Sequence, residues 1–236
     1  MKCRNYTIYI AAALLVACSP TYTLQSHNDE VINIQAEVDS TILAIINPYQ
    51  DSIEDQMSEV LTYTKNDLEK GKPQSTIGNF VTDLCLNYTN AHLCVMNNGG
   101  LRTTISKGEI TRGKLYELMP FENELVVLEL NKDDYISLLN YIGSRGGEPF
   151  SGITIVINKD GEIISNSWPA DFENGEKVRV LTSDYLANGG DKMSFFHAKE
   201  QQKVGVKLRD AIIDYCSKTD TIDVHLDNRI IILKNE

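Results

Sequence analysis

Three loop segments carry residue types that suit the binding of a small, partly anionic ligand. The first, Asn97-Asn98-Gly99-Gly100-Leu101-Arg102, follows an apolar stretch. Adjacent glycines let backbone amides approach a ligand closely, and an arginine offers a permanently charged fork for phosphate or carboxylate. Taken alone, the same residues also fit a tight turn with a surface arginine.

The other two segments add aromatic and acidic side chains. Pro120-Phe121-Glu122-Asn123 precedes an apolar stretch, and its phenylalanine could be a rigid stacking surface for a flat ligand. Residues 184–191 read Asp-Tyr-Leu-Ala-Asn-Gly-Gly-Asp, so Tyr185 is a second candidate ring and Asp191 could accept bonds from sugar hydroxyls. The alternatives are that Phe121 belongs to the core and that Asp191 only fixes its own loop.

Residue types that commonly perform catalysis are not grouped in the sequence. The four histidines, His27, His92, His197 and His225, are scattered. We find no serine or cysteine nucleophile beside a base and no P-loop. Asp223-Val224-His225 has the Asp-x-His form that opens a metallophosphoesterase site, but it lies near the C-terminus, and we interpret it as chance. We therefore predict no catalytic residue, metal ligand or cofactor in this chain.

The N-terminus has the order of a lipoprotein signal. Lys2 and Arg4 precede an apolar run over 8–17, which ends in Leu15-Val16-Ala17-Cys18. We expect a signal peptide over 1–17, a lipidated Cys18, a tether over 18–30 and one domain over 31–236. The protein would then be anchored in the cell envelope, facing the periplasm or the cell surface. The alternative is an ordinary secretory signal in which Cys18 is incidental.

Charge and cysteine content narrow the partners further. A formal net charge of -11 repels phosphate backbones, so we expect no nucleic-acid partner. Cleavage before Cys18 would leave Cys85, Cys94 and Cys216, and three thiols cannot all pair. We expect buried free cysteines, with a Cys85–Cys94 bridge as the alternative.

Hydrophobic periodicity and turn residues predict the elements that must position the loops. The irregular alternation of helices and strands favours an α+β fold, a single compact domain with a mixed β-sheet and flanking helices. We expect helices from Asn47-Pro48 to about Met57, after Ser75, after Asn131 and over 204–215, and strands over 60–64, 93–96, 124–130, 153–157, 163–164, 178–182, 221–224 and 229–233.

Together the loops resemble a known family. The Asn-Asn-Gly-Gly-Leu-Arg segment, then Gly108-Glu109-Ile110-Thr111, Pro-Phe-Glu-Asn and Tyr-Leu-Ala-Asn-Gly-Gly-Asp occur in the order found in the C-terminal domain of the 5'-nucleotidase family, which includes periplasmic UDP-sugar hydrolases. Less specific matches at Ser75–Asn79, Gly146-Gly147 and Ser151-Gly152 extend the resemblance over roughly residues 45–225.

The resemblance implies a nucleoside-binding role. The base would lie between Phe121 and Tyr185, Asn123 would bond its edge, Asp191 would contact the ribose and Arg102 would face the substrate. The expected substrate-binding set is Asn98, Gly99, Gly100, Arg102, Phe121, Asn123, Tyr185, Gly190 and Asp191.

Two departures from the family pattern matter. Relatives carry arginines just before the helix at Ile77, where this chain has only Lys70 and Lys72, and Tyr185 replaces a phenylalanine. In the family, hydrolysis uses two metals on an N-terminal domain that we do not find here. We therefore expect the nucleotide- or nucleoside-recognising half of a 5'-nucleotidase-type hydrolase, with divalent metals only on a partner metallophosphoesterase chain. The alternatives are a stand-alone nucleotide-binding lipoprotein, an interaction lipoprotein that has lost the ligand, and, least expected, autonomous hydrolysis.

Overall fold

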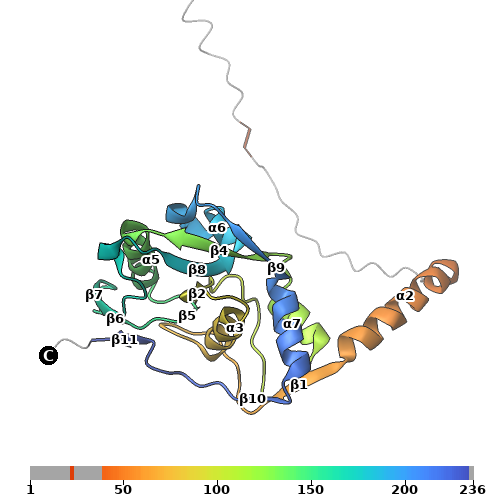
Figure 1. The fold of residues 1–236 in the computed structure, drawn as a ribbon. Coiled ribbons are helices and arrows are strands. Elements are labelled where there is room, and N and C mark those ends of the chain that lie inside the picture. The colour runs from red at the N-terminus through yellow and green to blue at the C-terminus, as the bar shows by residue number, and fades with distance from the viewer. Residues whose placement is uncertain (1–21, 24–38, 234–236) are drawn as a thin grey trace, which may run out of the picture. The chain divides into compact units, whose positions relative to one another are not determined.

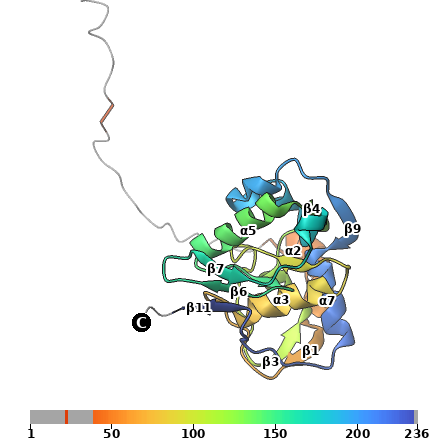
Figure 2. The ribbon, with the colours of Figure 1, turned by 60° about the vertical axis from the view of Figure 1, so that its left-hand side comes forward.

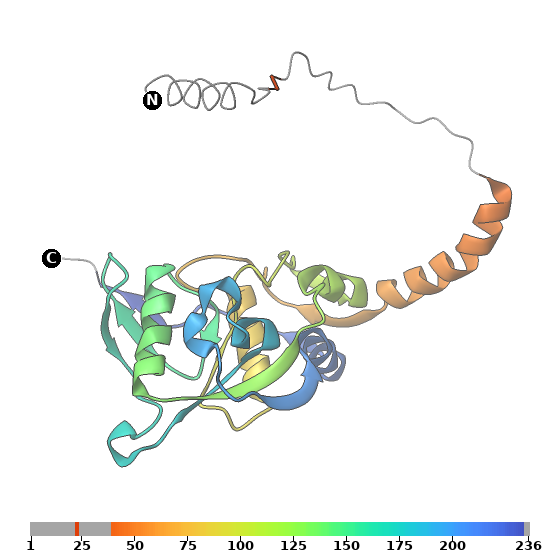
Figure 3. The ribbon, with the colours of Figure 1, turned by 90° about the horizontal axis from the view of Figure 1, so that it is seen from above.

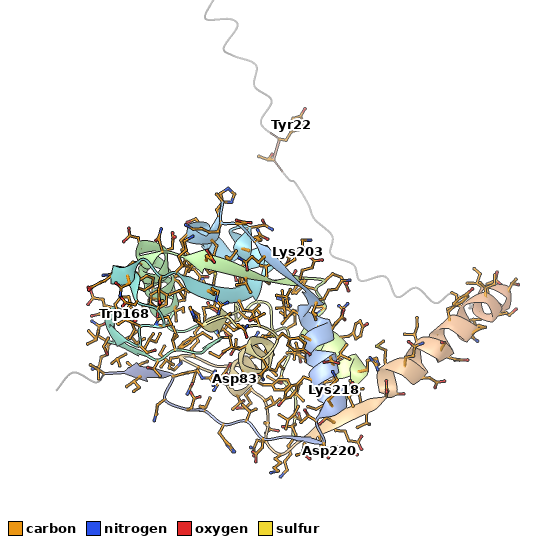
Figure 4. All side chains as sticks on the ribbon, viewed as in Figure 1. Tyr22, Asp83, Trp168, Lys203, Lys218 and Asp220 are labelled. Atoms are coloured by element: carbon orange, nitrogen blue, oxygen red, sulfur yellow. The ribbon has the colours of Figure 1, made fainter. Side chains whose placement is uncertain are left out.

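The structure, a computed structural model, describes residues 22–23 and 39–233 (Figure 1). The chain divides into two units, residues 1–44 and 45–236. The predicted signal peptide and Cys18 lie outside the described residues, as does the tether except for Tyr22 and Thr23; Tyr22 is exposed (Figure 4). Within the described residues, no helix combines the length and apolar character needed to cross a membrane.

A five-stranded mixed sheet organises the second unit. Its strands, in the order β5-β2-β8-β4-β9, are β5 (Phe150–Ser151), β2 (Leu93–Val95), β8 (Val178–Ser183), β4 (Glu124–Leu130) and β9 (Gln202–Lys207). Strands β2 and β8 are parallel, whereas β5 is antiparallel to β2 and β4 is antiparallel to both β8 and β9. The predicted mixed sheet is therefore confirmed.

Side chains of this sheet alternate between two hydrophobic cores. In β4, Leu125 and Val127 face a core shared with α3 (Thr76–Leu86), α4 (Arg112–Leu118) and α7 (Leu208–Lys218). Val126 and Leu128 face the other core, which α5 (Lys132–Ser144) covers. Figures 1 and 2 show α3 and α5 on opposite sides of the sheet. Because both faces are buried, the strand is almost continuously apolar in sequence.

Two three-stranded sheets flank the central one. One has the order β10-β1-β3, with β1 (Val60–Thr64), β3 (Gly108–Thr111) and β10 (Thr221–Ile222). The other has the order β11-β6-β7, with β6 (Ile155–Ile157), β7 (Ile163–Asn166) and β11 (Ile230–Ile232). The segment after α7 therefore gives each small sheet a parallel strand, so the C-terminal residues join distant parts of the unit.

Local capping chemistry starts helices α3 and α5 where it was predicted. The Ser75 hydroxyl accepts a hydrogen bond from the Gly78 amide at 3.0 Å, and Asn131 forms a reciprocal capping box with Asp134 at the start of α5. Short turns complete the chain: α6 (Asp184–Ala187) and the 3-10 turns η1 (Phe172–Asn174), η2 (Gly190–Lys192) and η3 (Ser194–Phe196). Turn η3 packs against α5, as Figure 3 shows from above.

Two predicted elements were wrong in their bounds. Helix α2 runs over Ser40–Ser58 with Pro48 inside it, so Asn47-Pro48 is not its start. A proline removes one backbone donor, and α2 continues on both sides of that gap. The helix expected from Val204 begins only at Leu208, because residues 202–207 pair with the edge of β4 as strand β9. Strand β3 and helix α4 were not predicted.

The three described cysteines, Cys85, Cys94 and Cys216, are free and buried. The preferred prediction is confirmed, and the alternative Cys85–Cys94 bridge is wrong. Burial raises the pKa of all three thiols, to about 12 for Cys216. The neutral thiols behave as small core side chains.

Candidate functional site

Sheet topology brings the three candidate loops together. The first loop follows β2 and the third follows β8, and these strands are parallel neighbours, so both loops leave the same edge of the sheet. The second loop precedes β4, which is antiparallel to β8, with Leu125 opposite Ser183. The amino end of β4, and with it the second loop, therefore lies at that edge too. Three segments far apart in sequence meet there because of strand direction alone.

The loops enclose a cavity of about 330 Å³ at this edge. Its lining residues are Asn97, Gly99, Gly100, Arg102, Phe121, Asn123, Tyr185 and Asp191. Of the predicted substrate-binding set, all but Asn98 and Gly190 line this cavity. Apolar rings with a few convergent polar groups are the usual composition of a small-molecule site.

The two aromatic rings of the cavity are half-exposed. Phe121 is 42% exposed and Tyr185 is 47% exposed, so neither is part of the core. The alternative that Phe121 is a core residue is therefore wrong. The two rings make no ring–ring contact with each other among the described aromatic pairs. Two half-exposed aromatic rings thus line one cavity.

Arg102 carries the positive charge that lines the cavity. Its guanidinium carbon lies 6.0 Å from the centroid of the Phe121 ring, and Nη1 donates a hydrogen bond to the Gly99 carbonyl at 3.2 Å. These two contacts hold the side chain over the first loop. Among the described residues, the other guanidinium donors have no hydrogen-bond partner and could serve an anionic group. Lys70 and Lys72 do not line the cavity, and the Lys72 ammonium bonds the Arg145 carbonyl instead.

Asp191 supplies the negative charge in a constrained backbone position. Its φ of 51° lies in the left-handed region, which non-glycine residues rarely occupy. The Asn97 side-chain amide donates to Oδ2 of Asp191, the Tyr141 hydroxyl donates to its carbonyl at 2.9 Å, and its own amide donates to the Tyr185 hydroxyl at 3.2 Å. Among the described residues, Oδ1 has no partner and can accept a bond from a ligand hydroxyl.

Asn98 and Gly190 support the cavity rather than line it. The Asn98 side chain turns to Glu148, with Nδ2 2.9 Å from Oε2, because the buried carboxylate needs donors. A Cβ on Gly190 would come within 2.6 Å of the Tyr185 ring, so only glycine leaves room for that ring. Asn97, which was not among the predicted residues, lines the cavity in place of Asn98.

A buried arginine on α7 contacts the second loop and its preceding residues. Arg209, on α7, forms an ion pair with Glu122, bonds the Met119 carbonyl and lies 4.2 Å from the centroid of the Tyr116 ring. Lys207 also pairs with Glu122. Glu122 lies between Phe121 and Asn123, so these pairs fix the loop that presents both. No local sequence signal pointed to Arg209.

The described residues hold no group of three or more histidine, cysteine, aspartate or glutamate side chains that could bind a metal ion. The Asp223-x-His225 pair is exposed, and Asp223 bonds Lys65 at 3.0 Å and His225 at 2.9 Å. The hydrogen bond from Lys65 lowers the pKa of Asp223. The exposed side chains of Asp223 and His225 do not fit the two-metal centre that the family resemblance implies. We therefore assign no metal-dependent step to the described part of this chain.

Fold and cavity together define an α+β domain with a cavity lined by three loops. The family model of the 5'-nucleotidase C-terminal domain matches residues 56–198, which is more than half of the 236-residue chain. The chain therefore belongs to the 5'-nucleotidase C-terminal domain family.

Individual relatives include named nucleotidases. The chain is 28% identical to an apyrase of Tabanus yao and 25% identical to a 5'-nucleotidase of Vibrio vulnificus, each over 67% of this chain. A 5'-nucleotidase precursor from Thermus thermophilus superposes with a TM-score of 0.71 at 25% identity, over 82% of this chain and 43% of that one. The matches cover only 34% and 31% of the two curated relatives, about a third of their length.

Proposed function

We propose that this chain is the nucleotide- or nucleoside-recognising half of a 5'-nucleotidase-type hydrolase that acts in nucleotide catabolism. The observation that carries the proposal is the convergence of Phe121, Tyr185, Arg102 and Asp191 on one cavity. A nucleobase has two flat apolar faces, and its stacking on aromatic side chains contributes about 1–3 kcal/mol per base. Because both rings are half-exposed, a base could stack on them without any rearrangement of the core.

Each polar group of the cavity has a matching part of a nucleotide. Asn123 would bond the polar edge of the base. Oδ1 of Asp191, which has no partner in the described part of the chain, would accept a bond from a ribose hydroxyl. Arg102 would face the phosphate-bearing side, because its guanidinium suits an anion. Family membership and the nucleotidase relatives support this assignment.

Hydrolysis on this proposal requires a second protein. A separate metallophosphoesterase chain would bind the divalent metals and perform the chemistry, while this chain positions the nucleoside end of the substrate. Lipidation of Cys18 would keep the pair at the cell envelope, facing the periplasm or the cell surface. This arrangement would account for the three cavity loops in a chain whose described residues hold no metal-binding cluster.

The recognition half is tested by calorimetry with adenosine and AMP on the purified protein. We expect micromolar binding, and Tyr185→Ala should weaken it at least tenfold because one stacking surface is lost. Tyr63→Ala is the matched control, because Tyr63 on β1 is 49% exposed but does not line the cavity. Equal affinity of the Tyr185→Ala and wild-type proteins would contradict the proposal.

The catalytic half is tested by mixing with a candidate metallophosphoesterase chain and measuring phosphate release from AMP. We expect a metal-dependent rate that this chain raises and that Tyr185→Ala fails to raise. Micromolar binding with neither complex formation nor rate gain would instead favour the stand-alone binding role. A metal-dependent rate from this chain alone, at rigorous purity, would contradict the need for a partner.

A further inference from the structure

A buried carboxylate lies directly behind the first loop. The Glu148 side chain is 0% exposed, and it follows the C-terminal end of α5. Its Oε2 accepts hydrogen bonds from the Asn98 amide at 2.7 Å and from Asn98 Nδ2 at 2.9 Å. Its Oε1 accepts from Arg145 Nε at 3.1 Å. A buried charge is stable only when paired in this way, so Glu148 fixes both Asn98 and Arg145.

Arg145 continues the connection toward the third loop. Its guanidinium carbon lies 5.7 Å from the centroid of the Tyr141 ring, one turn earlier on α5. The hydrogen bond to Glu148 raises the pKa of Arg145, and burial raises the pKa of Tyr141, so the phenol keeps its proton. That hydroxyl donates to the Asp191 carbonyl at 2.9 Å. Asp191 in turn contacts Asn97 on the first loop. These contacts form a closed circuit that runs from the first loop through Glu148, Arg145, Tyr141 and Asp191 back to the first loop.

We propose that Glu148 is a positioning residue that sets the placement of the first loop relative to the third, acting through Arg145 and Tyr141. None of these three residues lines the cavity. The left-handed backbone of Asp191 and Lys192 is costly for non-glycine residues and needs surrounding contacts to persist. The carbonyl bond from Tyr141 is such a contact. Any effect on ligand affinity rests on the proposed function, whereas the loop geometry does not.

The test is hydrogen–deuterium exchange of the ligand-free full chain carrying Glu148→Gln. A glutamine has one oxygen acceptor, so it cannot serve both Asn98 and Arg145. We expect amides in residues 97–102 to exchange about tenfold faster, the factor that follows from loss of a charge-assisted hydrogen bond. The decisive readout is the exchange rate of the amides in residues 188–193, to which Glu148 makes no hydrogen bond. We expect acceleration there too, while the amides of α3 stay unchanged.

Two further variants separate a specific role from a general loss of stability. Glu129→Gln is the matched control, because Glu129 forms an exposed pair with Lys177 and lies outside the circuit; both loops should exchange as in wild type. Tyr141→Phe removes only the hydroxyl that bonds Asp191, and it should accelerate both loops even if Glu148→Gln folds poorly. Acceleration confined to residues 97–102 in Glu148→Gln, or unchanged exchange of both loops in Tyr141→Phe, would overturn the proposal.

A ligand measurement on the same variants distinguishes this proposal from the assigned function. If AMP binds the wild type, Glu148→Gln should bind it about tenfold more weakly, and Glu148→Asp, which keeps the charge, should recover part of the loss. If AMP does not bind the wild type, the nucleotide assignment fails, and the exchange result alone decides whether Glu148 positions the loops.

Discussion

Individual residues at the cavity divide into those that present a surface and those that make room for it. Tyr185 presents a half-exposed ring, and Gly190 makes room because its missing Cβ would lie 2.6 Å from that ring. Asn97 and Asn98 are adjacent but act differently: one lines the cavity and the other bonds the buried Glu148. The chemistry of a residue type therefore does not by itself say which of these two tasks it performs.

Gly190→Ala tests whether a glycine at this position is needed to make room for the Tyr185 ring. The added methyl would also lie 2.6 Å from the Tyr185 carbonyl oxygen, so the ring or the turn must shift. We expect AMP affinity to fall about as much as in Tyr185→Ala, and the free energy of unfolding to fall by roughly 1–3 kcal/mol, as for overpacked sites. Calorimetry and thermal melting measure the two effects. Gly71→Ala is the comparison variant: its Cβ would meet the Gln74 carbonyl oxygen at 3.3 Å, a far smaller overlap, so it should cost less in both measurements.

Elements of this protein differ sharply in how much they bury. Helix α3 buries eight of its residues between the central sheet and α7, whereas no described residue of α2 is buried. Both helices carry apolar residues at helical spacing, so periodicity alone does not separate them. Helix α3 packs against β2, β5 and α7, and these contacts bury its residues.

Paired alanine variants check this contrast by urea unfolding. Phe80→Ala on α3 removes a fully packed ring that contacts Tyr215 edge-on, and we expect a loss of roughly 3–5 kcal/mol. Ile46→Ala on α2 removes an exposed side chain, and we expect a change within about 0.5 kcal/mol. A loss of several kcal/mol from Ile46→Ala would mean that this face of α2 is packed in solution.

At the scale of the whole second unit, the C-terminal segment joins separate parts of the fold. Arg229 sits at its centre: the guanidinium bonds Asp83 on α3, Asp227 and the Phe150 carbonyl of β5. Beyond Arg229, β11 pairs with β6. One largely covered cation thus links a helix, the central sheet and a small sheet.

The pH dependence of stability follows from this arrangement. Hydrogen bonds from Arg229 lower the pKa of Asp227 below its unfolded value of about 3.9. The stabilisation is therefore fully present above the unfolded pKa and is lost as the pH falls through the lower folded value. Arg229→Met should cost roughly 1–3 kcal/mol at neutral pH.

Thermal melting of both proteins between pH 7 and pH 2 provides the measurement. The difference between the melting temperatures of wild type and Arg229→Met should narrow as the pH falls through the lowered folded pKa of Asp227. Lys177→Met, which removes an exposed partner of Glu129, is the control and should change the melting temperature little. A difference that stays constant down to pH 2 would contradict this account.

Sequence alone determined the elements whose signals are local. Strand β4 was predicted from a continuous apolar run, and α3 and α5 from capping residues followed by one apolar face. Those signals lie within a few residues of the element itself, so no knowledge of distant partners is needed. The loops that line the cavity were predicted from their order along the chain, which resembles the 5'-nucleotidase C-terminal domain; taken singly, each also fitted a turn or a core residue.

Tertiary structure decided everything that depends on a partner far along the chain. Residues 202–207 became a strand because β4 offered an open edge, against the helical spacing that starts at Val204. Asn97 rather than Asn98 reached the cavity because Glu148, some fifty residues later, bonds the other amide. The directions of β2, β8 and β4 brought the three loops to one edge. Strand pairing and buried charges are long-range interactions, and a sequence lists residues in order without stating which of them meet.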